Sequence, residues 1–360
     1  MYIYLFICYL VFFILFFSRK IKNEEVKSSN KIFLSNYLIF FSFVIFFLFA
    51  ALRKNVGTDY IEYVILFKNI INDEKLSFST NIEPIFVILC EIIGFFSNNP
   101  VWIFIITSFI IYYFLFKTIL KECKFYELGI FLFIAFNFYT SSLNIVRQWM
   151  AITIVLYSYT FLKEGNKNKF LKYVILAICC HYTAIIVLLF SKLIFKINDE
   201  KTRIIIIFLG VLFYLNTNFI VNILQSLCLK IPIFIKYYKY LSLNENIGGN
   251  VLVLPMFCII TYVLYLYQKR NKDLKIYINI LCLGFFVSII GQRMLIFNRL
   301  QYYFVAILVI VIPKIIMMMN EKDKKISYFI CFLLGSLFYI YSLNKNGGEP
   351  IPYQTIFSNI

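Results

Sequence analysis

The stretch IFLSNYLIFFSFVIFFLFAAL, residues 32–52, contains 21 residues and no charged side chain. An α-helix of that length is about 30 Å long and matches the hydrocarbon layer of a membrane. Similar apolar runs recur along all 360 residues, of which 62% are hydrophobic and only 15% charged. Soluble domains carry roughly 25% charged residues. The sequence therefore predicts an all-α, polytopic membrane helix bundle and excludes a secreted, cytosolic or nucleic-acid-binding protein.

About ten full transmembrane spans are expected, in a single domain that covers residues 1–360. The predicted spans are 2–17, 32–52, 100–119, 126–142, 144–162, 203–219, 251–267, 276–292, 300–319 and 326–343. Two further apolar stretches, 82–97 and 170–196, are expected to be re-entrant or broken helices. The second is interrupted by Cys180-His181-Tyr182-Thr183, and such breaks are tolerated where they are packed in protein or line a wet cavity. A single tilted helix over 170–196 is the alternative, and it would invert every later span.

The basic residues orient this topology. Lys and Arg of membrane proteins concentrate in cytoplasmic loops, which accounts for the net charge of +17. Six linkers hold 24 of the 35 basic residues: Arg19–Lys31, Lys117–Lys124, Lys163–Lys172, Lys192–Arg203, Lys269–Lys275 and Lys314–Lys325. We place all six inside the cell. Both termini and the linkers 53–81, 220–250 and 293–299 then lie outside.

The predicted outer face collects a polar set that membrane anchoring does not require. It comprises Arg53, Asp59, Tyr60, Tyr63, Glu83, Arg147, Gln148, the only histidine His181, Arg293 and Arg299. Arg147 is the strongest candidate because it lies about one turn into an apolar helix. An arginine at that position is costly unless it meets an anion or a wet cavity.

Several members of the set have structural alternatives. Arg53 and Arg293 stand at span ends, where arginines often reach the lipid headgroups. Tyr60 and Tyr63 fit an aromatic belt at the membrane surface. Glu83 before a proline is a favourable helix start. The lone His181 is equally compatible with a hydrogen-bonded core residue.

Taken together, the set suggests a site for a doubly charged, lipid-linked anion. Arginine binds phosphate oxygens in pairs, so the arginines are predicted to converge on one pocket. Asp59, Glu83 and His181 are the groups available to move a proton, and we favour Asp59 or Glu83 as the base. No metal-ligand cluster, glycine-rich phosphate loop or nucleotide motif is visible, so neither a metal nor a cofactor is expected.

Five motifs then indicate a family. They are Arg53-x3-Gly57-Thr58-Asp59-Tyr60-x2-Tyr63, Glu83-Pro84, Asn144-x2-Arg147-Gln148-x2-Ala151, Ala177-x3-His181-x-Thr183-Ala184 and Pro352-Tyr353. In this order they resemble the EpsG family of Wzy-like exopolysaccharide and O-antigen polymerases. The resemblance spans nearly the whole chain.

The resemblance implies a bacterial inner-membrane glycosyltransferase whose site faces the outside or periplasm. Such an enzyme polymerises undecaprenyl-diphosphate-linked oligosaccharide repeat units into capsule, exopolysaccharide or O-antigen, and its expected partners are membrane lipids, a flippase and a chain-length regulator. Asp59, Glu83, His181 and Arg147 are the predicted catalytic residues. Substrate binding is assigned to Arg53, Tyr60, Tyr63, Gln148, Arg293 and Arg299. The alternatives are a flippase for the same lipid-linked oligosaccharides and an O-antigen ligase-type transferase.

Overall fold

A computed structural model describes residues 1–22, 29–72, 82–197, 200–230, 238, 273–292 and 294–358. This part of the chain contains helices and no strand, and one isolated antiparallel bridge joins Arg53 to Thr355. The all-α fold predicted from the apolar runs is therefore confirmed. The chain divides into two compact units: Met1–Phe161 with Asn168–Tyr182 and Leu308–Ile360, and Leu162–Lys167 with Thr183–Ile307.

Six helices among the described residues are long and apolar enough to cross a membrane, and a bent pair adds a seventh candidate. The six are Tyr2–Lys22, Ser29–Ala51, Val101–Glu122, Leu274–Gly291, Phe297–Met318 and Glu321–Lys345. Each overlaps a predicted span. The predicted span 251–267 lies outside the described residues. The 13-residue helix Pro84–Phe96 is too short to cross, in agreement with the half-helix expected at 82–97.

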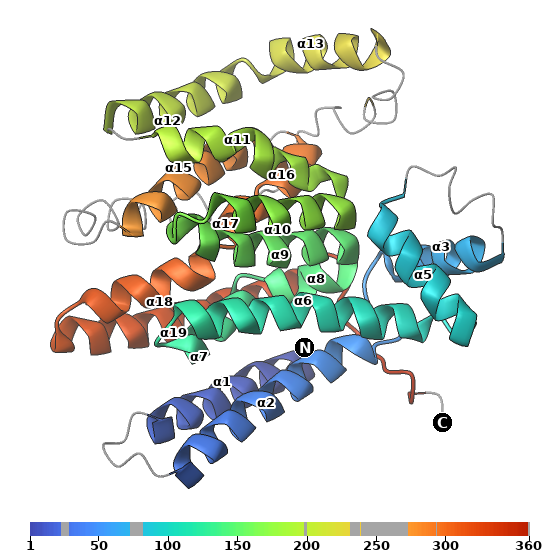
Figure 1. Cartoon of the computed structure of the whole chain (residues 1–360), viewed down its shortest axis with the longest axis vertical. Helices are drawn as coiled ribbons and strands as arrows, with labels where there is room; N and C mark the ends of the chain where they lie inside the picture. The colour runs from blue at the N-terminus through green and yellow to red at the C-terminus, as the bar shows by residue number, and fades with distance from the viewer. Residues whose placement is uncertain are drawn as a thin grey trace. The chain divides into compact units, whose positions relative to one another are not determined.

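The first unit holds most of the helices (Figure 1). They are α1 (Tyr2–Lys22), α2 (Ser29–Ala51), α3 (Tyr60–Asn72), α5 (Pro84–Phe96), α6 (Val101–Glu122), α7 (Tyr126–Ala135), α8 (Phe138–Asn144), α9 (Val146–Lys163), α10 (Lys167–Cys180), α18 (Leu308–Met318) and α19 (Glu321–Lys345). Helices α1 and α2 lie side by side as a hairpin, and α2 packs on α6. Ser18 Oγ of α1 is 3.0 Å from both Ser35 Oγ of α2 and Tyr126 OH of α7, so hydroxyl groups join three helices in an otherwise apolar region.

Helix α7 forms the centre of the first unit. All ten of its residues are buried, among α1, α6, α18 and α19. Beyond Tyr126 and Glu127 in its first turn the helix is apolar on every face, which is typical of a helix buried in a protein core or a membrane. The predicted span 126–142 is not continuous, because Asn137 takes φ +63° between α7 and α8. Asparagine tolerates this left-handed conformation better than most residues, which explains the position of the break.

The second unit contains the 3₁₀ turn η1 (Tyr182–Ala184) and six α-helices. These are α11 (Ile185–Lys196), α12 (Glu200–Leu215), α13 (Thr217–Lys230), α15 (Asp273–Gly291), α16 (Leu295–Leu300) and α17 (Tyr302–Val305). Helix α12 packs along α15, where buried Arg203 donates from Nε to Asn279 Oδ1 at 3.1 Å. Helix α13 turns away from α12 by 83°, so the span predicted at 203–219 ends earlier, near Asn216.

The apolar stretch 170–196 is broken, as the sequence predicted. Helix α10 ends at Cys180, His181 is non-helical, and η1 precedes α11. A continuous helix over 170–196 is therefore wrong, and the side on which its two halves enter and leave the membrane stays a prediction.

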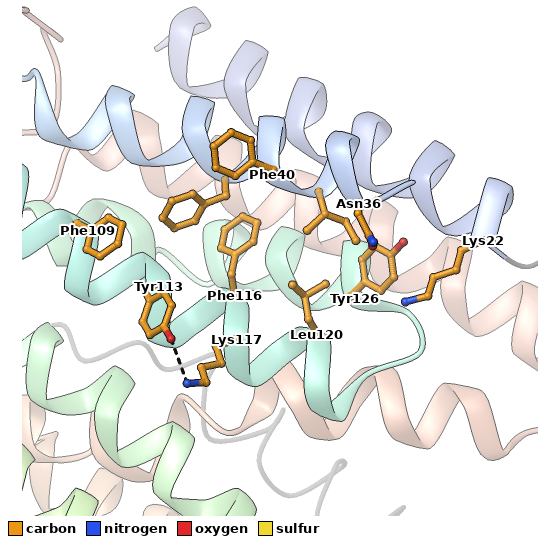
Figure 2. A pocket seen from close by; sticks show the side chains of 11 residues that line it. Lys22, Asn36, Phe40, Phe109, Tyr113, Phe116, Lys117, Leu120 and Tyr126 are labelled. Carbon is orange, nitrogen blue, oxygen red and sulfur yellow. Dashed lines mark hydrogen bonds between the residues drawn. The ribbon is translucent and has the colours of Figure 1, made fainter. Parts of the chain in front are cut away.

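A groove of about 550 Å³ opens between α2 and α6 in the first unit (Figure 2). Its walls are mainly aromatic, and Lys22 and Lys117 also line it. The groove belongs to one end of α6, because Lys117 lies near that helix's C-terminus. The N-terminal end of α6 leads towards the polar residues described next.

Candidate active site

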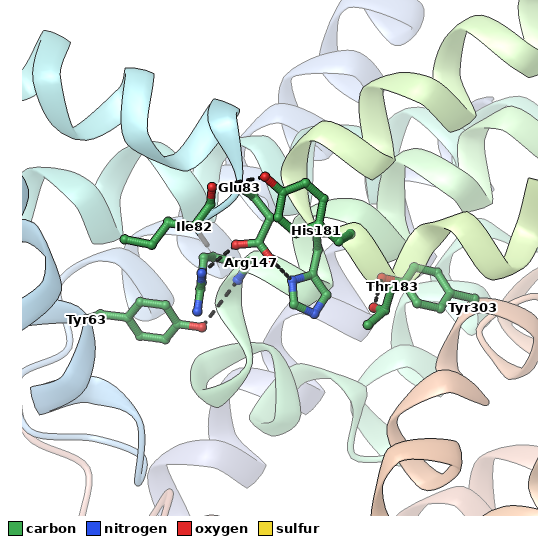
Figure 3. A network of polar contacts seen from close by, with 8 residues as sticks. Tyr63, Ile82, Glu83, Arg147, His181, Thr183 and Tyr303 are labelled. Carbon is green, nitrogen blue, oxygen red and sulfur yellow. Dashed lines mark hydrogen bonds and ion pairs between the residues drawn. The ribbon is translucent and has the colours of Figure 1, made fainter. Parts of the chain in front are cut away.

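Three side chains that are far apart in the sequence meet in the first unit (Figure 3). Arg147 Nη1 donates to Glu83 Oε2 at 2.5 Å, and His181 Nδ1 lies 2.5 Å from Glu83 Oε1. Each carboxylate oxygen of Glu83 is thus engaged by a different neighbour. The Glu83 side chain is 5% exposed, whereas those of Arg147 and His181 are 25% and 22% exposed. The solvent-exposed surface of this Glu83 cluster therefore belongs mainly to Arg147 and His181.

Each residue of the Glu83 cluster stands at a helix end. Glu83 has an extended backbone directly before α5, and Pro84 occupies the first helical position, where proline is favoured. Arg147 lies in the first turn of α9, after Ile145 interrupts the path from α8. His181 directly follows α10. Helix ends leave backbone groups without intrahelical partners, so polar residues are tolerated there more readily than within the apolar spans.

Aromatic rings surround the guanidinium of Arg147. Its central carbon lies 5.4 Å from the centre of the Phe86 ring and 5.8 Å from that of Tyr63, distances typical of cation–π contact. The Tyr63 hydroxyl also accepts from the backbone N–H of Arg147 at 3.5 Å. Burial raises the pKa of Tyr63 more than the nearby Arg147 lowers it, so the phenol stays neutral. Tyr63 thus supports Arg147 instead of supplying a charge.

Glu83, which precedes a helix too short to span, is held ionised. Burial alone raises its pKa, but the hydrogen bond from His181 and the charge of Arg147 together bring the pKa below its ordinary value. An ionised Glu83 only accepts hydrogen bonds, so His181 donates from Nδ1. A neutral imidazole in this tautomer carries its lone pair on Nε2, which has no hydrogen-bond partner among the described residues. Nδ1 is therefore committed to Glu83, and Nε2 is the ring nitrogen that stays available to a ligand.

Asp59 and Tyr60, two further predicted site residues, belong to the start of α3. Asp59 Oδ1 accepts from Thr58 Oγ1 at 3.0 Å, and its backbone oxygen accepts from Tyr63 N at 3.1 Å. No hydrogen bond joins Asp59 to the Glu83 cluster within the described chain. Tyr60 is buried and stacks on Phe104, with ring centres 4.4 Å apart. Both placements agree with local structural roles.

Arg53 lies in the protein interior, with an exposed fraction of 1%. It donates from Nη1 to Ala50 O at 2.5 Å and from Nη2 to Leu143 O at 3.0 Å. Its guanidinium also lies 4.7 Å from the ring centre of Phe104. Arg53 therefore joins the end of α2 to the end of α8. This is a structural role, whereas the sequence predicted that Arg53 contacts the substrate.

The C-terminal segment 346–358, here called the strap, crosses the loop that follows α2. Lys54 N donates to Gln354 O at 2.9 Å, and Asn144 Nδ2 donates to Gly348 O at 2.8 Å. Because Asn144 is only three residues from Arg147, the strap restrains the segment that carries the Arg147 side chain. Asn144 belongs to one of the sequence motifs, but its spacing there predicts no role.

Tyr353 anchors the strap to α2. Its ring stacks on Phe49 with centres 3.9 Å apart, and its hydroxyl donates to Phe49 O at 2.7 Å. Two glycines allow the strap and loop to approach Asn144: Gly57 has φ +93° and Gly348 has φ +78°, and a Cβ on either would collide with the Asn144 side chain. The Pro352-Tyr353 motif was the one sequence signal for this arrangement.

The remaining predicted residues are dispersed. Gln148 is buried on α9, next to Arg147. Arg299 is exposed on α16 of the second unit, and Arg293 lies outside the described residues. Of the four arginines predicted to converge, only Arg147 is seen beside the acidic and imidazole groups. Their common role in phosphate binding stays a prediction.

A family model described as the EpsG family matches residues 36–355. The chain belongs to the EpsG family. This is the family of Wzy-like exopolysaccharide polymerases, as the motifs had indicated. Comparisons with curated proteins and with solved structures gave no significant match.

The EpsG match includes every part of the site. It contains Glu83, Arg147 and His181, and it extends through the strap to Thr355. The protein is therefore a multi-pass membrane protein of the exopolysaccharide polymerase type. Its Glu83 cluster is the one place among the described residues where a histidine, an acid and an arginine meet.

Proposed function

We propose that this EpsG-family protein polymerises undecaprenyl-diphosphate-linked oligosaccharide repeat units into surface polysaccharide at the outer face of the bacterial cytoplasmic membrane. One observation carries the proposal: Glu83 joins Arg147 and His181, and both partners remain partly exposed. Family membership supports the reaction type, and the cluster supplies a base and a cation for it. Capsule, exopolysaccharide and O-antigen are the products considered, and the sugar is left open.

His181 is the general base in this proposal. Glu83 accepts the Nδ1 proton of His181 and so fixes the ring and its tautomer, while Nε2 takes the proton from the acceptor hydroxyl of an incoming unit. The deprotonated oxygen attacks the anomeric carbon of the growing glycan. A new glycosidic C–O bond forms as the C–O bond to the diphosphate breaks. The sequence favoured Asp59 or Glu83 as the base; we propose His181 instead, and the engagement of both Glu83 carboxylate oxygens supports this choice.

Arg147 stabilises the leaving group. The electron pair of the broken bond goes to undecaprenyl diphosphate, so negative charge grows on the diphosphate oxygens. Arg147 commits Nη1 to Glu83, and a quarter of its side chain stays exposed, which is the surface that we propose meets the anion. The Phe86 and Tyr63 rings restrict the guanidinium, so little ordering is needed when substrate binds. A magnesium ion has no assigned role here.

The orientation follows from the basic linkers and is part of the proposal. With those linkers in the cytoplasm, the loop after α2 and the strap lie outside, together with the Glu83 cluster. A flippase that delivers repeat units to that face and a regulator of chain length are the expected pathway partners. Asp59, Tyr60 and Gln148 retain supporting roles in holding the site, and Arg293 and Arg299 stay predicted phosphate contacts.

Arg147→Lys in producing cells tests the proposal. Lysine keeps the charge but loses the paired donors of arginine. We expect polymer to fall at least about tenfold while single repeat units accumulate on the lipid at the outer face. Arg19→Lys is the matched control, because Arg19 also pairs with a buried glutamate, Glu127, at 2.7 Å, but at the other end of the unit.

Three results would contradict the proposal. Unchanged polymer length with Arg147→Lys removes the diphosphate role. Loss of repeat units from the outer face indicates a flippase. Normal polymer that fails only to reach its final acceptor indicates a ligase.

A further inference from the structure

Helix α13 carries side chains of three kinds on three separate stripes. Consecutive residues of an α-helix lie about 100° apart around its axis, and residues four positions apart lie on nearly the same face. The first stripe is apolar and exposed, and it consists of Phe219, Ile223 and Leu227. The second starts one residue earlier and is polar and exposed, and it consists of Asn218, Asn222 and Ser226. Leu229 in the last turn departs from this pattern, because it is apolar and lies beside the polar stripe.

The third stripe of α13 is buried and packs on the end of α15. It consists of Thr217, Val221 and Cys228. Val221 and Cys228 form an apolar cluster with two residues that flank the end of α15, Ile290 and Met294. Helix α15 contains one of the six candidate membrane spans, which ends with the helix itself. Helix α13 therefore lies beside the end of a candidate span, at the level where the hydrocarbon layer meets the headgroups.

The bend before α13 prevents it from continuing α12 across the membrane. The two helices meet at 83°, so the 14 residues of α13, about 21 Å long, advance only about 3 Å in the direction of α12. The corner is closed by its own hydrogen bonds. Thr217 Oγ1 donates to Tyr214 O at 2.6 Å. Asn216 Nδ2 donates to Leu212 O at 2.9 Å. Carbonyl groups at the end of α12 thus find donors within the protein, as a bend close to hydrocarbon requires.

The side-chain pattern changes at this bend. From Ile204 to Leu215, α12 has apolar residues on every side, which is typical of a membrane span. An apolar stripe beside a polar stripe, as on α13, is instead typical of a helix that lies flat at the membrane surface with its apolar side immersed about 5–10 Å. The exposed apolar surface is continuous around the corner, because Leu215 is 69% exposed and Phe219, one turn later, is 68% exposed. The same acyl chains that face the end of α12 can therefore cover the apolar stripe of α13.

We propose that α13 lies in the plane of the membrane at the boundary between acyl chains and headgroups. Its apolar stripe contacts acyl chains, its polar stripe faces the hydrated headgroups, and its buried stripe joins it to α15. Lys230 is the only charged residue of α13, so no preference for anionic lipid is expected. The orientation proposed above places α13 at the outer leaflet. The interfacial position itself depends neither on that orientation nor on the chemistry of the Glu83 cluster.

Fluorescence quenching in the full chain tests this position. One fluorescent amino acid is incorporated by stop-codon suppression at a single residue of the apolar or the polar stripe, and each variant is reconstituted in phosphatidylcholine vesicles. Two quenchers are compared: iodide, which stays in water, and a lipid that carries a nitroxide on its acyl chain close to the headgroup. We expect the lipid to be the stronger quencher on the apolar stripe and iodide on the polar stripe. The ratio of the two quenching constants should therefore reverse between neighbours such as Asn222 and Ile223.

Phe208 is the matched control for depth. It is 59% exposed and lies within the apolar run of α12. A fluorophore at this position should be quenched more strongly by a nitroxide near the methyl end of the acyl chain, whereas the apolar stripe of α13 should respond more strongly to the nitroxide near the headgroup. Thermal unfolding of each variant checks that the labelled chain is folded.

Three outcomes would overturn the proposal. Strong quenching of both exposed stripes by lipid, with none by iodide, would show that α13 enters the hydrocarbon layer as part of a re-entrant segment. Quenching of both stripes by iodide alone would place the helix in water. Protection of the apolar stripe from both quenchers would show that protein covers it, either a second copy or another part of this chain.

Discussion

Glu83→Gln is the sharpest perturbation of the site, because it changes one atom and keeps the shape. The carboxylate accepts from Arg147 Nη1 and from His181 Nδ1, each at 2.5 Å. An amide has only one acceptor oxygen, and its NH₂ group donates. Either Arg147 or His181 must therefore face the NH₂ group of the amide, which is itself a hydrogen-bond donor. If that neighbour is His181, the ring turns or changes tautomer, and Nε2 no longer serves as the base.

The expected magnitude follows from this geometry. A hydrogen bond to a charged group contributes about 1.5–3 kcal/mol, and loss of a positioned general base costs about 10²–10⁴-fold in rate. We expect the rate constant for joining two repeat units to fall about 10³-fold, equivalent to roughly 4 kcal/mol of transition-state stabilisation. Stability should fall by only about 1–2 kcal/mol, because Arg147 and His181 are partly solvated.

The assay measures dimer formation from purified lipid-linked repeat units in reconstituted vesicles, together with thermal unfolding of each variant. A double-mutant cycle separates catalysis from structure. If Glu83 acts through His181, then Glu83→Gln/His181→Gln should be no slower than the slower single variant. A folded Glu83→Gln protein with a rate within tenfold of the wild type would refute this reasoning. So would single-variant losses that multiply to about 10⁶ in the double variant.

Other perturbations address the scaffold and the conditions. Arg53→Met should lower the melting temperature by several degrees, because Ala50 O and Leu143 O lose their donor; an unchanged melting curve would contradict the buried role. Tyr353→Leu should cut the polymerisation rate several-fold through the strap, whereas Tyr341→Leu, at an exposed position, should not. The folded-state pKa of Glu83 is lowered, so its contribution to stability is complete above about pH 4.5 and is lost as the pH falls further; the melting-temperature difference between wild type and Glu83→Gln should shrink below that pH. Chelation is expected to leave the rate within twofold, and a loss reversed by magnesium would show that a metal takes part.

The fold could be predicted from sequence wherever one local rule dominates. Charge-free runs such as 32–52 predict spans because helices must satisfy their own backbone groups in lipid. The break after Cys180 was predictable because polar His181 and Thr183 interrupt an apolar stretch. The break at Asn137 was missed, since a single asparagine inside 126–142 is compatible with a continuous span. Its left-handed backbone depends on how α7 and α8 pack, which no local pattern reveals.

The sequence could indicate candidate residues for the site but not their arrangement. Arg147 and His181 stood out because each is costly inside an apolar environment. Their common partner could not be derived, because Glu83 is 64 residues from Arg147 and 98 from His181 along the chain. Arg53 shows the same limit. An arginine at the end of a span can anchor the helix to lipid headgroups, contact a ligand, or link two helices in the protein interior. Only the packing of α8 and the strap distinguishes these three roles.

The pairing of Arg147 with Glu83 also bears on the proposed binding of a lipid-linked diphosphate. A lone guanidinium at this depth would be expensive to bury, so the carboxylate stabilises Arg147 when no substrate is bound. An arriving diphosphate brings negative charge to the exposed edge of the guanidinium while Glu83 holds the opposite edge. Two anions then share one cation. The ion pair between Arg147 and Glu83 becomes weaker, and the hydrogen bond between His181 Nδ1 and Glu83 becomes stronger. In the proposed mechanism, donor binding thus holds the His181 ring more firmly against Glu83, so that Nε2 is aligned for the acceptor hydroxyl once the donor is in place.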